Sequence, residues 1–319
     1  MKLITFEDIQ KLNIDPSLCV EWVSEMIKNK KSSILPAKIS MHPSEGAFCN
    51  IMPCMIPNLT TSTLFGGVKI VNRYPNRIPS LDSKLLLLDM NTGDFLALMD
   101  ANWITAMRTG AVATHSINLF AKKDFEKISI LGLGNTARAT LLCLLSVFPE
   151  RHFIIKLLKY KEQETLFLER FKEYPNLHFE YVDNYRSLAL GSDVIISCAT
   201  YFENDICSDE CFEEGVLVVP IHTRGFTNCD LFFNKVYADD YNHVCHFKNF
   251  NKFNSFGEVC DVVNFNAIGR ENNQERILVY NIGLAIHDIN FAAHIYQLMK
   301  DNDKLLNLDM LDPKEKFWI

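Results

Sequence analysis

Apolar and polar positions alternate in two different ways along this chain. In the first third, runs with alternating apolar residues predict half-buried strands, and Asn91-Thr-Gly93 between two of them is typical of a hairpin turn. From about residue 120 to 285, short apolar runs are separated by helical stretches. Buried parallel strands have this second pattern. We therefore predict an α/β protein, with a largely antiparallel α+β domain and a Rossmann-type doubly wound parallel sheet.

The expected boundaries follow from these patterns. A capped helix pair over 5–30 opens the chain, and the last helix, over 284–300, is expected to pack back on the first third. The first domain is then discontinuous, with residues 1–115 plus 286–319, and the second covers 116–285. Between these ends we expect strands over 36–41, 48–55, 63–71, 83–90, 94–99, 128–131, 153–158, 178–182, 194–197 and 216–219, and helices over 102–120, 136–145, 162–173, 185–190 and 256–263.

A glycine turn after Ile128–Leu131 carries the first chemical signal. Gly132 permits a tight turn, Gly134 lets the backbone approach a pyrophosphate, and Ala137 lets the following helix pack closely. Free N–H groups at a helix start also favour an anion. The alternative is an ordinary glycine-rich turn between a strand and a helix. Strand, turn and helix together predict a dinucleotide site.

The end of the second strand of this unit indicates which dinucleotide binds. An acidic residue at that position binds the ribose hydroxyls of NAD in such folds. Here the strand ends in Lys159-Tyr-Lys161, and the next carboxylate is Glu162. Both lysines could accept a 2′-phosphate, or both could be a solvated strand end. We therefore favour NADP(H) over NAD(H).

Composition excludes several other classes. The net charge of −7 and a pI of about 5.7 do not favour nucleic acid as a partner. No apolar run reaches transmembrane length, and no signal peptide is visible. Ten cysteines without a secretion signal predict reduced thiols and a cytoplasmic location. No metal site is expected, because the spacing of the cysteines and histidines at 207, 211, 243, 245 and 246 matches no usual zinc pattern.

Two basic residues are candidates for a substrate site. Lys69 lies in an apolar strand, where it is either an outward charge or a buried group that can exchange protons with an amine or imine. Arg108 lies near the start of the 102–120 helix, and its guanidinium suits a carboxylate or a surface ion pair. The residues alone leave both alternatives open.

Five motifs follow one another along the chain: Gly67-Val-Lys69-Ile-Val-Asn72, Leu87-Leu-Asp89, Arg108-Thr-Gly-Ala111, Gly132-Leu-Gly-Asn-Thr-Ala-Arg138, and Tyr280-Asn-Ile-Gly283-Leu-Ala with Asp288. Together they resemble the ornithine cyclodeaminase/mu-crystallin family. The resemblance implies a nicotinamide-nucleotide fold, a substrate domain made from both termini, a homodimer built on that domain, and a small amino- or imino-acid substrate. It implies that Lys69 acts at the reacting nitrogen, that Arg108 holds the substrate carboxylate, and that Thr109 lies near the cofactor.

The chain departs from the family pattern at two places. Lys38 stands where the family usually has an arginine, which keeps the charge but not the bidentate geometry; it could equally be a surface lysine. In the loop after 216–219, His222 takes the place of the catalytic aspartate of the cyclodeaminases. A histidine there could supply acid–base chemistry or be structural. Arg224 could be a second carboxylate clamp, a cofactor contact or a solvated arginine.

We therefore expect an NAD(P)H-dependent oxidoreductase acting on a small α-amino or cyclic α-imino acid, by imine reduction or amino-acid dehydrogenation. The alternatives are ornithine cyclodeamination to L-proline and ammonia, and a non-catalytic protein that binds NADP(H) and a small ligand. The expected site consists of Lys69 and His222 for catalysis; Lys38, Met52, Lys69 and Arg108 for substrate; and Thr109, Gly132, Gly134, Asn135, Thr136, Ala137, Lys159, Lys161, Ala199 and Thr200 for the cofactor.

Overall fold

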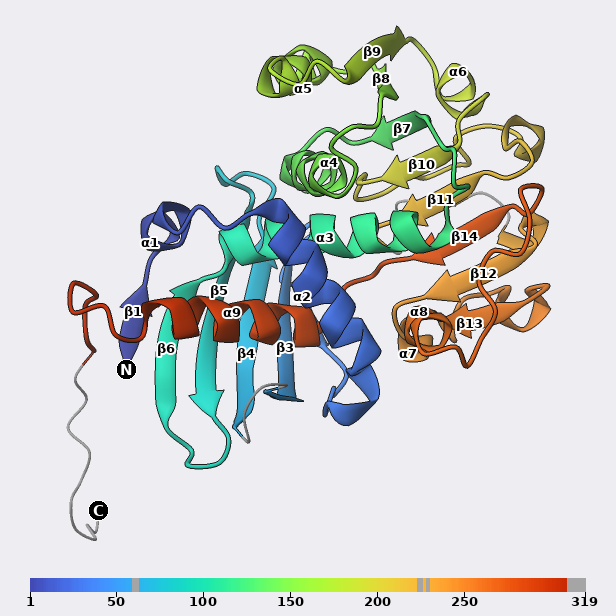
Figure 1. Ribbon diagram of the computed structural model, residues 1–319. Helices are drawn as coiled ribbons and strands as arrows, with labels where there is room; N and C mark the ends of the chain where they lie inside the picture. The colour runs from blue at the N-terminus through green and yellow to red at the C-terminus, as the bar shows by residue number, and fades with distance from the viewer. Residues whose placement is uncertain (59–62, 223–225, 228–229, 309–319) are drawn as a thin grey trace, which may run out of the picture. The chain divides into compact units, whose positions relative to one another are not determined.

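The computed structural model describes residues 1–58, 63–222, 226–227 and 230–308, and the chain forms two compact units. The first unit comprises Met1–Asn13, Ser32–Thr105 and the chain from Asp288 onward; the second comprises Ile14–Lys31 and Ala106–His287. Each unit is built on its own sheet (Figure 1). This is the α/β class expected from the sequence, and the first unit is discontinuous. No helix in the described ranges is long and apolar enough to span a lipid bilayer.

The first unit holds a six-stranded sheet in the order β1-β6-β5-β4-β3-β2. All neighbours are antiparallel except β1, which runs parallel to β6. Helix α9 crosses one face of this sheet (Figure 1), and its Ile289 packs against β4 so closely that a Cβ on Gly67 would lie 2.8 Å from the Ile289 side chain. The elements are β1 (Lys2–Ile4), α1 (Phe6–Lys11), β2 (Ile39–Met41), β3 (Phe48–Pro57), β4 (Leu64–Arg73), β5 (Leu81–Asp89), β6 (Phe95–Asp100) and α9 (Ala285–Met299).

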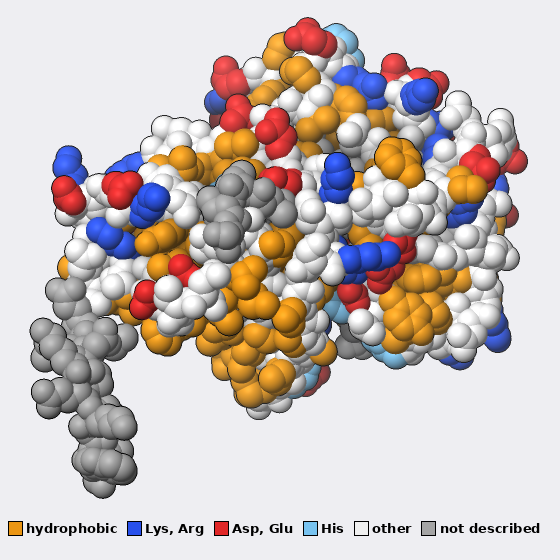
Figure 2. Space-filling view, turned by 60° about the horizontal axis from the view of Figure 1, so that its bottom comes forward, with side chains coloured by type: hydrophobic (Ala, Val, Ile, Leu, Met, Phe, Trp, Pro, Cys, Tyr) orange, Lys and Arg blue, Asp and Glu red, His pale blue; other side chains and the backbone are white. Residues whose placement is uncertain are grey.

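The two faces of this sheet differ in burial. The face under α9 is apolar and buried, and it includes Phe65, Leu85 and Met99. The opposite face is mixed: Ile39 is 57% exposed and Ile70 is 41% exposed, and the ion pair of Lys84 with Asp100 lies beside Ile70 in the strand register. In the space-filling view, hydrophobic side chains gather in broad areas of the surface (Figure 2). Large exposed apolar patches on proteins are typical of interaction surfaces.

The second unit holds an eight-stranded, all-parallel sheet in the order β13-β12-β14-β11-β10-β7-β8-β9. Helices lie on both faces, with α4 on one and α6 on the other (Figure 1). The strand order reverses between β7 and β10, which is where ligands bind in such sheets. The elements are α2 (Pro16–Lys28), α3 (Asn102–Phe120), β7 (Lys127–Leu131), α4 (Asn135–Val147), β8 (Phe153–Leu158), α5 (Gln163–Phe171), β9 (Leu177–Val182), α6 (Tyr185–Ala189), β10 (Val194–Ser197), β11 (Leu217–Pro220), β12 (Lys235–Ala238), α7 (Tyr241–Val244), β13 (Phe256–Glu258), α8 (Val259–Val263) and β14 (Ile277–Tyr280), with short 3-10 turns at Lys30–Ser32, Asp209–Cys211, Asp230–Phe232 and Phe250–Lys252.

The structure corrects one expected element and adds several. The stretch 256–263 was expected to be helical, but Phe256–Glu258 forms β13 beside β12, and only Val259–Val263 is a helix. Strands β1, β12 and β14 were not expected, because each is only three or four residues long and depends on partners distant in sequence. Residues 14–31 and 106–115 group with the second unit rather than with the first, and the buried side of α2 packs on α4 and α8.

Candidate active site

The glycine turn lies at the carboxyl edge of the parallel sheet. Gly132 has a φ of +78°, and a Cβ there would lie 2.9 Å from the backbone nitrogen of Ala199. The Cys198 N–H donates to the Leu131 carbonyl at 2.8 Å, which extends the β7–β10 pairing up to this turn. The structure thus brings Gly132 and Ala199, both expected at the cofactor, together at the point where the strand order reverses. Thr200 follows and is exposed.

Helix α4 begins directly after this turn, and the space beside its N-cap residue is unfilled. Its N-cap, Gly134, makes no side-chain cap, and no atom lies within 4 Å of the place where a Cβ would stand. Asn135 is exposed and Thr136 half-buried, whereas Ala137 is completely buried. The first N–H groups of a helix have no acceptor within it and attract anions. Glycine turn and helix start together fit the pyrophosphate of a dinucleotide.

Helix α3 packs unusually closely against α4. A Cβ on Gly110 would lie 2.4 Å from the backbone of Ala139, and the Thr114 hydroxyl donates to the Thr140 carbonyl at 3.2 Å. Thr109 precedes Gly110 and is 9% exposed. The close crossing therefore places Thr109 on the part of α3 that packs against α4.

The strand-end lysines have neighbours that the sequence did not indicate. Lys159 Nζ lies 2.9 Å from the Asp183 carboxylate, which follows β9, and this hydrogen bond raises the pKa of Lys159. The side chains of Lys159 and Asp183 are 53% and 76% exposed, and such surface pairs contribute little stability. Lys161 has a φ of +51°, and its Nζ lies 5.1 Å from the centroid of the Tyr160 ring. Both lysines can therefore leave their present contacts for an anionic ligand.

Lys69 is the largest completely buried polar side chain among the described residues of the first unit. It lies on the α9 side of β4, opposite Met52 of β3 in the strand register. Its Nζ is 2.7 Å from Oδ1 of Asp288, which is in the first turn of α9, and both side chains are 0% exposed. A buried ammonium requires such a partner to remain charged. The outward-lysine alternative is excluded, and Lys69 and Met52 lie together.

Asp288 was not among the expected site residues, although it closes one of the sequence motifs. A carboxylate within the mostly apolar run of α9 was the available signal, since Asp is rarely fully buried unless paired.

Arg108 is 8% exposed and lies against the turn that joins β14 to α9. A Cβ on Gly283 would lie 2.6 Å from Nη1 of Arg108, and Gly283 has a φ of +97°. The guanidinium therefore packs directly on a backbone position where only glycine fits.

The expected residues His222 and Lys38 lie at exposed positions. His222 is exposed and lies just after β11. The chain still pairs with β10 at this point, because the Ile221 N–H donates to the Ser197 carbonyl at 2.9 Å. His222 is thus at the carboxyl edge of the sheet that carries the glycine turn. Lys38 is exposed and precedes β2 in the first unit. Arg224 lies outside the described residues.

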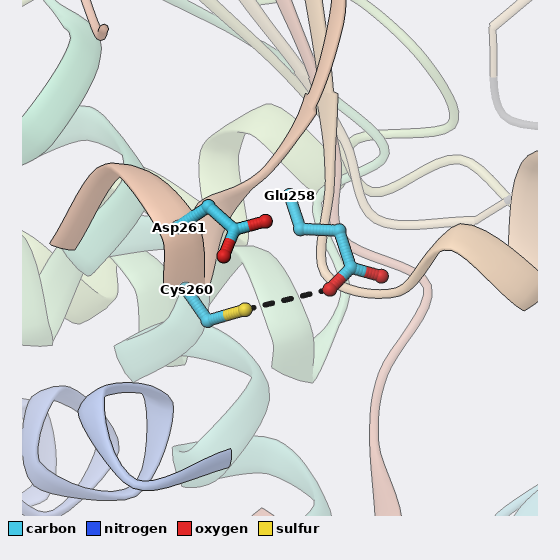
Figure 3. A group of neighbouring side chains, drawn as sticks. All are labelled: Glu258, Cys260 and Asp261. Atoms are coloured by element: carbon cyan, nitrogen blue, oxygen red, sulfur yellow. Dashed lines mark hydrogen bonds between the residues drawn. The ribbon is translucent and has the colours of Figure 1, made fainter. Parts of the chain in front are cut away.

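One group of side chains has the composition of a metal site. Glu258, Cys260 and Asp261 offer ligand atoms within 4.8 Å of one another, and the Cys260 thiol donates to Glu258 Oε2 at 3.4 Å (Figure 3). Two ammonium groups neutralise this group: Lys30 Nζ is 3.1 Å from Glu258, and Lys31 Nζ is 2.6 Å from Asp261. Burial raises the pKa of the Cys260 thiol to about 11. We assign these residues to ion pairs.

A small cavity lies beside this group in the second unit. Its volume is about 10 Å³, which holds a single water molecule at most. Ser116, Asn281 and His287 are among the residues that line it. It is too small for a substrate.

Parallel sheet, glycine turn and open helix start define an α/β enzyme with a Rossmann-type dinucleotide domain. The chain belongs to the ornithine cyclodeaminase/mu-crystallin family, because a sequence model of that family matches residues 5–303. The resemblance seen in the motifs is thereby confirmed. Membership makes this chain a nicotinamide-dependent enzyme of amino- or imino-acid chemistry.

Individual relatives are similar over most of their length. The N-((2S)-2-amino-2-carboxyethyl)-L-glutamate dehydrogenase of Staphylococcus aureus is 27% identical over 248 residues, which is 72% of each chain. The Delta(1)-pyrroline-2-carboxylate reductase of Colwellia psychrerythraea is 23% identical over 245 residues, 72% of this chain and 77% of the relative. The solved Delta(1)-pyrroline-2-carboxylate reductase of Thermococcus litoralis, in complex with NADH and L-proline, has a TM-score of 0.83 at 24% identity and covers 97% of this chain and 100% of that chain. This structural likeness shows the shared fold.

Proposed function

We propose that this enzyme reduces a small α-imino acid, cyclic imines included, to the amino acid, and that it can run the same step in reverse. The observation that carries the proposal is the completely buried Lys69–Asp288 pair, with its 2.7 Å contact. An ammonium kept out of water by a sheet and a helix, with its charge held by one carboxylate, is suited to proton transfer at a nitrogen.

Reduction of an imine needs a hydride at the α-carbon and a proton at the nitrogen. NAD(P)H supplies the hydride when it is bound. Lys69 donates the proton to the imine nitrogen, and Asp288 favours the charged lysine before that donation. In the reverse direction the neutral amine of Lys69 takes the proton back. Lysine, not the nearby Met52, is the group on this face that can do so.

Arg108 binds the substrate carboxylate in this proposal. Its guanidinium offers a bidentate fork and is packed on Gly283, which limits its movement. Lys38 adds a second positive charge near the substrate, and His222 a second acid–base group. The histidine at 222 favours net reduction over ornithine cyclodeamination, because the family's catalytic aspartate is missing there.

The cofactor is proposed to be NADP(H) rather than NAD(H). Lys159 and Lys161 are exposed, and no carboxylate stands among residues 157–161. The Asp183 contact on Lys159 is a surface pair that a 2′-phosphate can displace. The pyrophosphate is assigned to the start of α4, with Gly132, Gly134, Asn135, Thr136 and Ala137, and Thr109, Ala199 and Thr200 complete the site.

A homodimer and a cytoplasmic location complete the proposal. The exposed face of the six-stranded sheet, with its apolar residues Ile39 and Ile70, suits a second copy of the same face. Ile70→Asp should then shift the protein from dimer to monomer in light scattering, whereas Lys172→Asp, at an exposed lysine of the second unit, should not. None of the nine described cysteines forms a disulfide, as expected in a reducing compartment.

The test mixes the purified protein with NADPH and pyrroline-2-carboxylate or piperideine-2-carboxylate, and follows nicotinamide absorbance. The proposal expects consumption of NADPH, and a loss of rate of about 10²-fold or more in Lys69→Met with unchanged cofactor binding. Formation of proline and ammonia from L-ornithine, without net change in the cofactor, would instead identify a cyclodeaminase. Tight NADPH binding with neither reaction would identify the non-catalytic alternative.

A further inference from the structure

A second buried carboxylate, Asp239, lies directly behind the turn on which Arg108 rests. It follows β12 at the carboxyl edge of the parallel sheet and is 5% exposed. Its Oδ2 accepts the Gly283 N–H at 2.6 Å, and its Oδ1 lies 3.2 Å from Nδ1 of His243. The mechanism proposed above uses neither of these groups.

We propose that Asp239 is a positioning residue for the carboxylate clamp, and that it acts on Arg108 through Gly283. The inference rests on the role proposed for Arg108. Asp239 fixes the backbone of Gly283, and Gly283 is the surface against which the Arg108 guanidinium packs, with Nη1 2.6 Å from where a Cβ would be. Movement of that backbone therefore moves the guanidinium.

The geometry of Gly283 explains why an acid is needed here. Gly283 has a φ of +97° in the turn between β14 and α9, and its N–H donates to the Asp239 carboxylate. A buried N–H without an acceptor is costly, and a carboxylate accepts it more strongly than a neutral group. Asp239 is itself fixed, because its N–H donates to the Tyr280 carbonyl at 3.0 Å.

The residues before Gly283 are held from other directions. The Asn281 N–H donates to the Pro220 carbonyl at 2.9 Å. The side-chain oxygen of Asn281 accepts from the hydroxyl of Ser116, a residue of α3, at 3.1 Å. Ser116 and Arg108 both lie on α3, so this helix carries the guanidinium and is also hydrogen-bonded to the chain just before the Gly283 turn. Asp239 is the member of this network that contacts Gly283 itself.

The test compares Asp239→Ala with Asp239→Asn. Alanine removes the acceptor, and we expect the KM for the imino acid to rise about tenfold, with kcat changed less than threefold and NADPH affinity unchanged within about twofold. Asparagine keeps an oxygen that can accept the Gly283 N–H, so it should restore KM to within about threefold of the wild type. In an Arg108→Ala background, Asp239→Ala should add less than about twofold to KM.

Asp240→Ala is the matched control. This neighbouring acid is also buried, and it pairs with Lys30 at 2.7 Å rather than with the 281–284 turn. It should lower Tm while leaving KM unchanged. A merely structural role for Asp239 would give the same outcome for Asp239→Ala, and that result would overturn the inference.

Crystal structures of the wild type and of both Asp239 variants provide a readout that needs no turnover. We expect Arg108 and Gly283 to be displaced in Asp239→Ala and to keep their positions in Asp239→Asn. An unmoved Arg108 in Asp239→Ala overturns the inference even if the enzyme is active. An enzyme without imino-acid turnover overturns the proposed function, whereas the displacement still decides the role of Asp239.

Discussion

Variants of the Lys69–Asp288 ion pair can show separately how this contact affects the stability of the fold and the rate of imine reduction. Removing one partner of a completely buried pair leaves a buried charge without compensation and costs about 3–5 kcal/mol. At about 3 °C per kcal/mol for domains of this size, Lys69→Met and Asp288→Asn should each lower Tm by roughly 10 °C. Differential scanning calorimetry measures this fall directly.

The double variant Lys69→Met/Asp288→Leu gives the decisive comparison. Replacing both charges by apolar groups of similar size is often neutral or stabilising, so its Tm should recover to within about 5 °C of the wild type. Its imine-reduction rate should stay at least about 10²-fold low, because no proton donor is restored. Lys84→Met is the control: it breaks exposed pairs with Asp82 and Asp100 in the same sheet, and should cost less than about 1 kcal/mol.

Two results would refute this reasoning. A double variant as unstable as the sum of the single variants would show that the two charges do not compensate each other. A double variant that reduces imines at the wild-type rate would show that Lys69 is not the proton donor.

Three further predictions concern the second unit. Gly134→Val should leave Tm within a few degrees, because no atom lies within 4 Å of its Cβ position, yet weaken NADPH binding at least tenfold by fluorescence titration, since the pyrophosphate needs that space. Lys159→Ala should weaken NADPH more than NADH in the same titration, and Asp183→Asn, which frees Lys159, should tighten NADPH; equal effects on both cofactors would contradict the assignment. Burial alone would raise the pKa of Asp240. The hydrogen bond and charge of Lys30 lower this pKa by more than burial raises it, so it lies below the ordinary value of 3.8. The stability that this ion pair contributes is therefore present above about pH 4 and is lost as the pH falls through the pKa of Asp240 in the folded protein. The difference in Tm between the wild type and Asp240→Asn should then be largest near pH 7 and shrink below about pH 4.

Features set by local sequence were predictable. The strand–turn–helix at Gly132 follows from a buried apolar run, glycines that permit the turn, and a helix-forming stretch, and the structure has β7 and α4 there. Helix α3 begins and ends at the expected residues, Asn102 and Phe120. These features need no knowledge of distant partners.

Features set by contacts between distant residues were not predictable. Phe256–Glu258 becomes a strand because an adjacent strand, β12, is available for pairing, which outweighs the helical pattern that continues into α8. Lys69 and Asp288 are 219 positions apart, and Asp239 and Gly283 are 44 apart, so no local pattern pairs them. The candidate residues could be named from motifs, but their partners only from the fold.

The central claim is that this enzyme passes a hydride from the nicotinamide to the α-carbon of a small imino acid. The most direct measurement uses NADPH carrying deuterium at the transferable position, with pyrroline-2-carboxylate as substrate, and examines the product by mass spectrometry and NMR. We predict proline with one deuterium, located on the α-carbon. Product without the label, or no product while NADPH is bound, would contradict the claim.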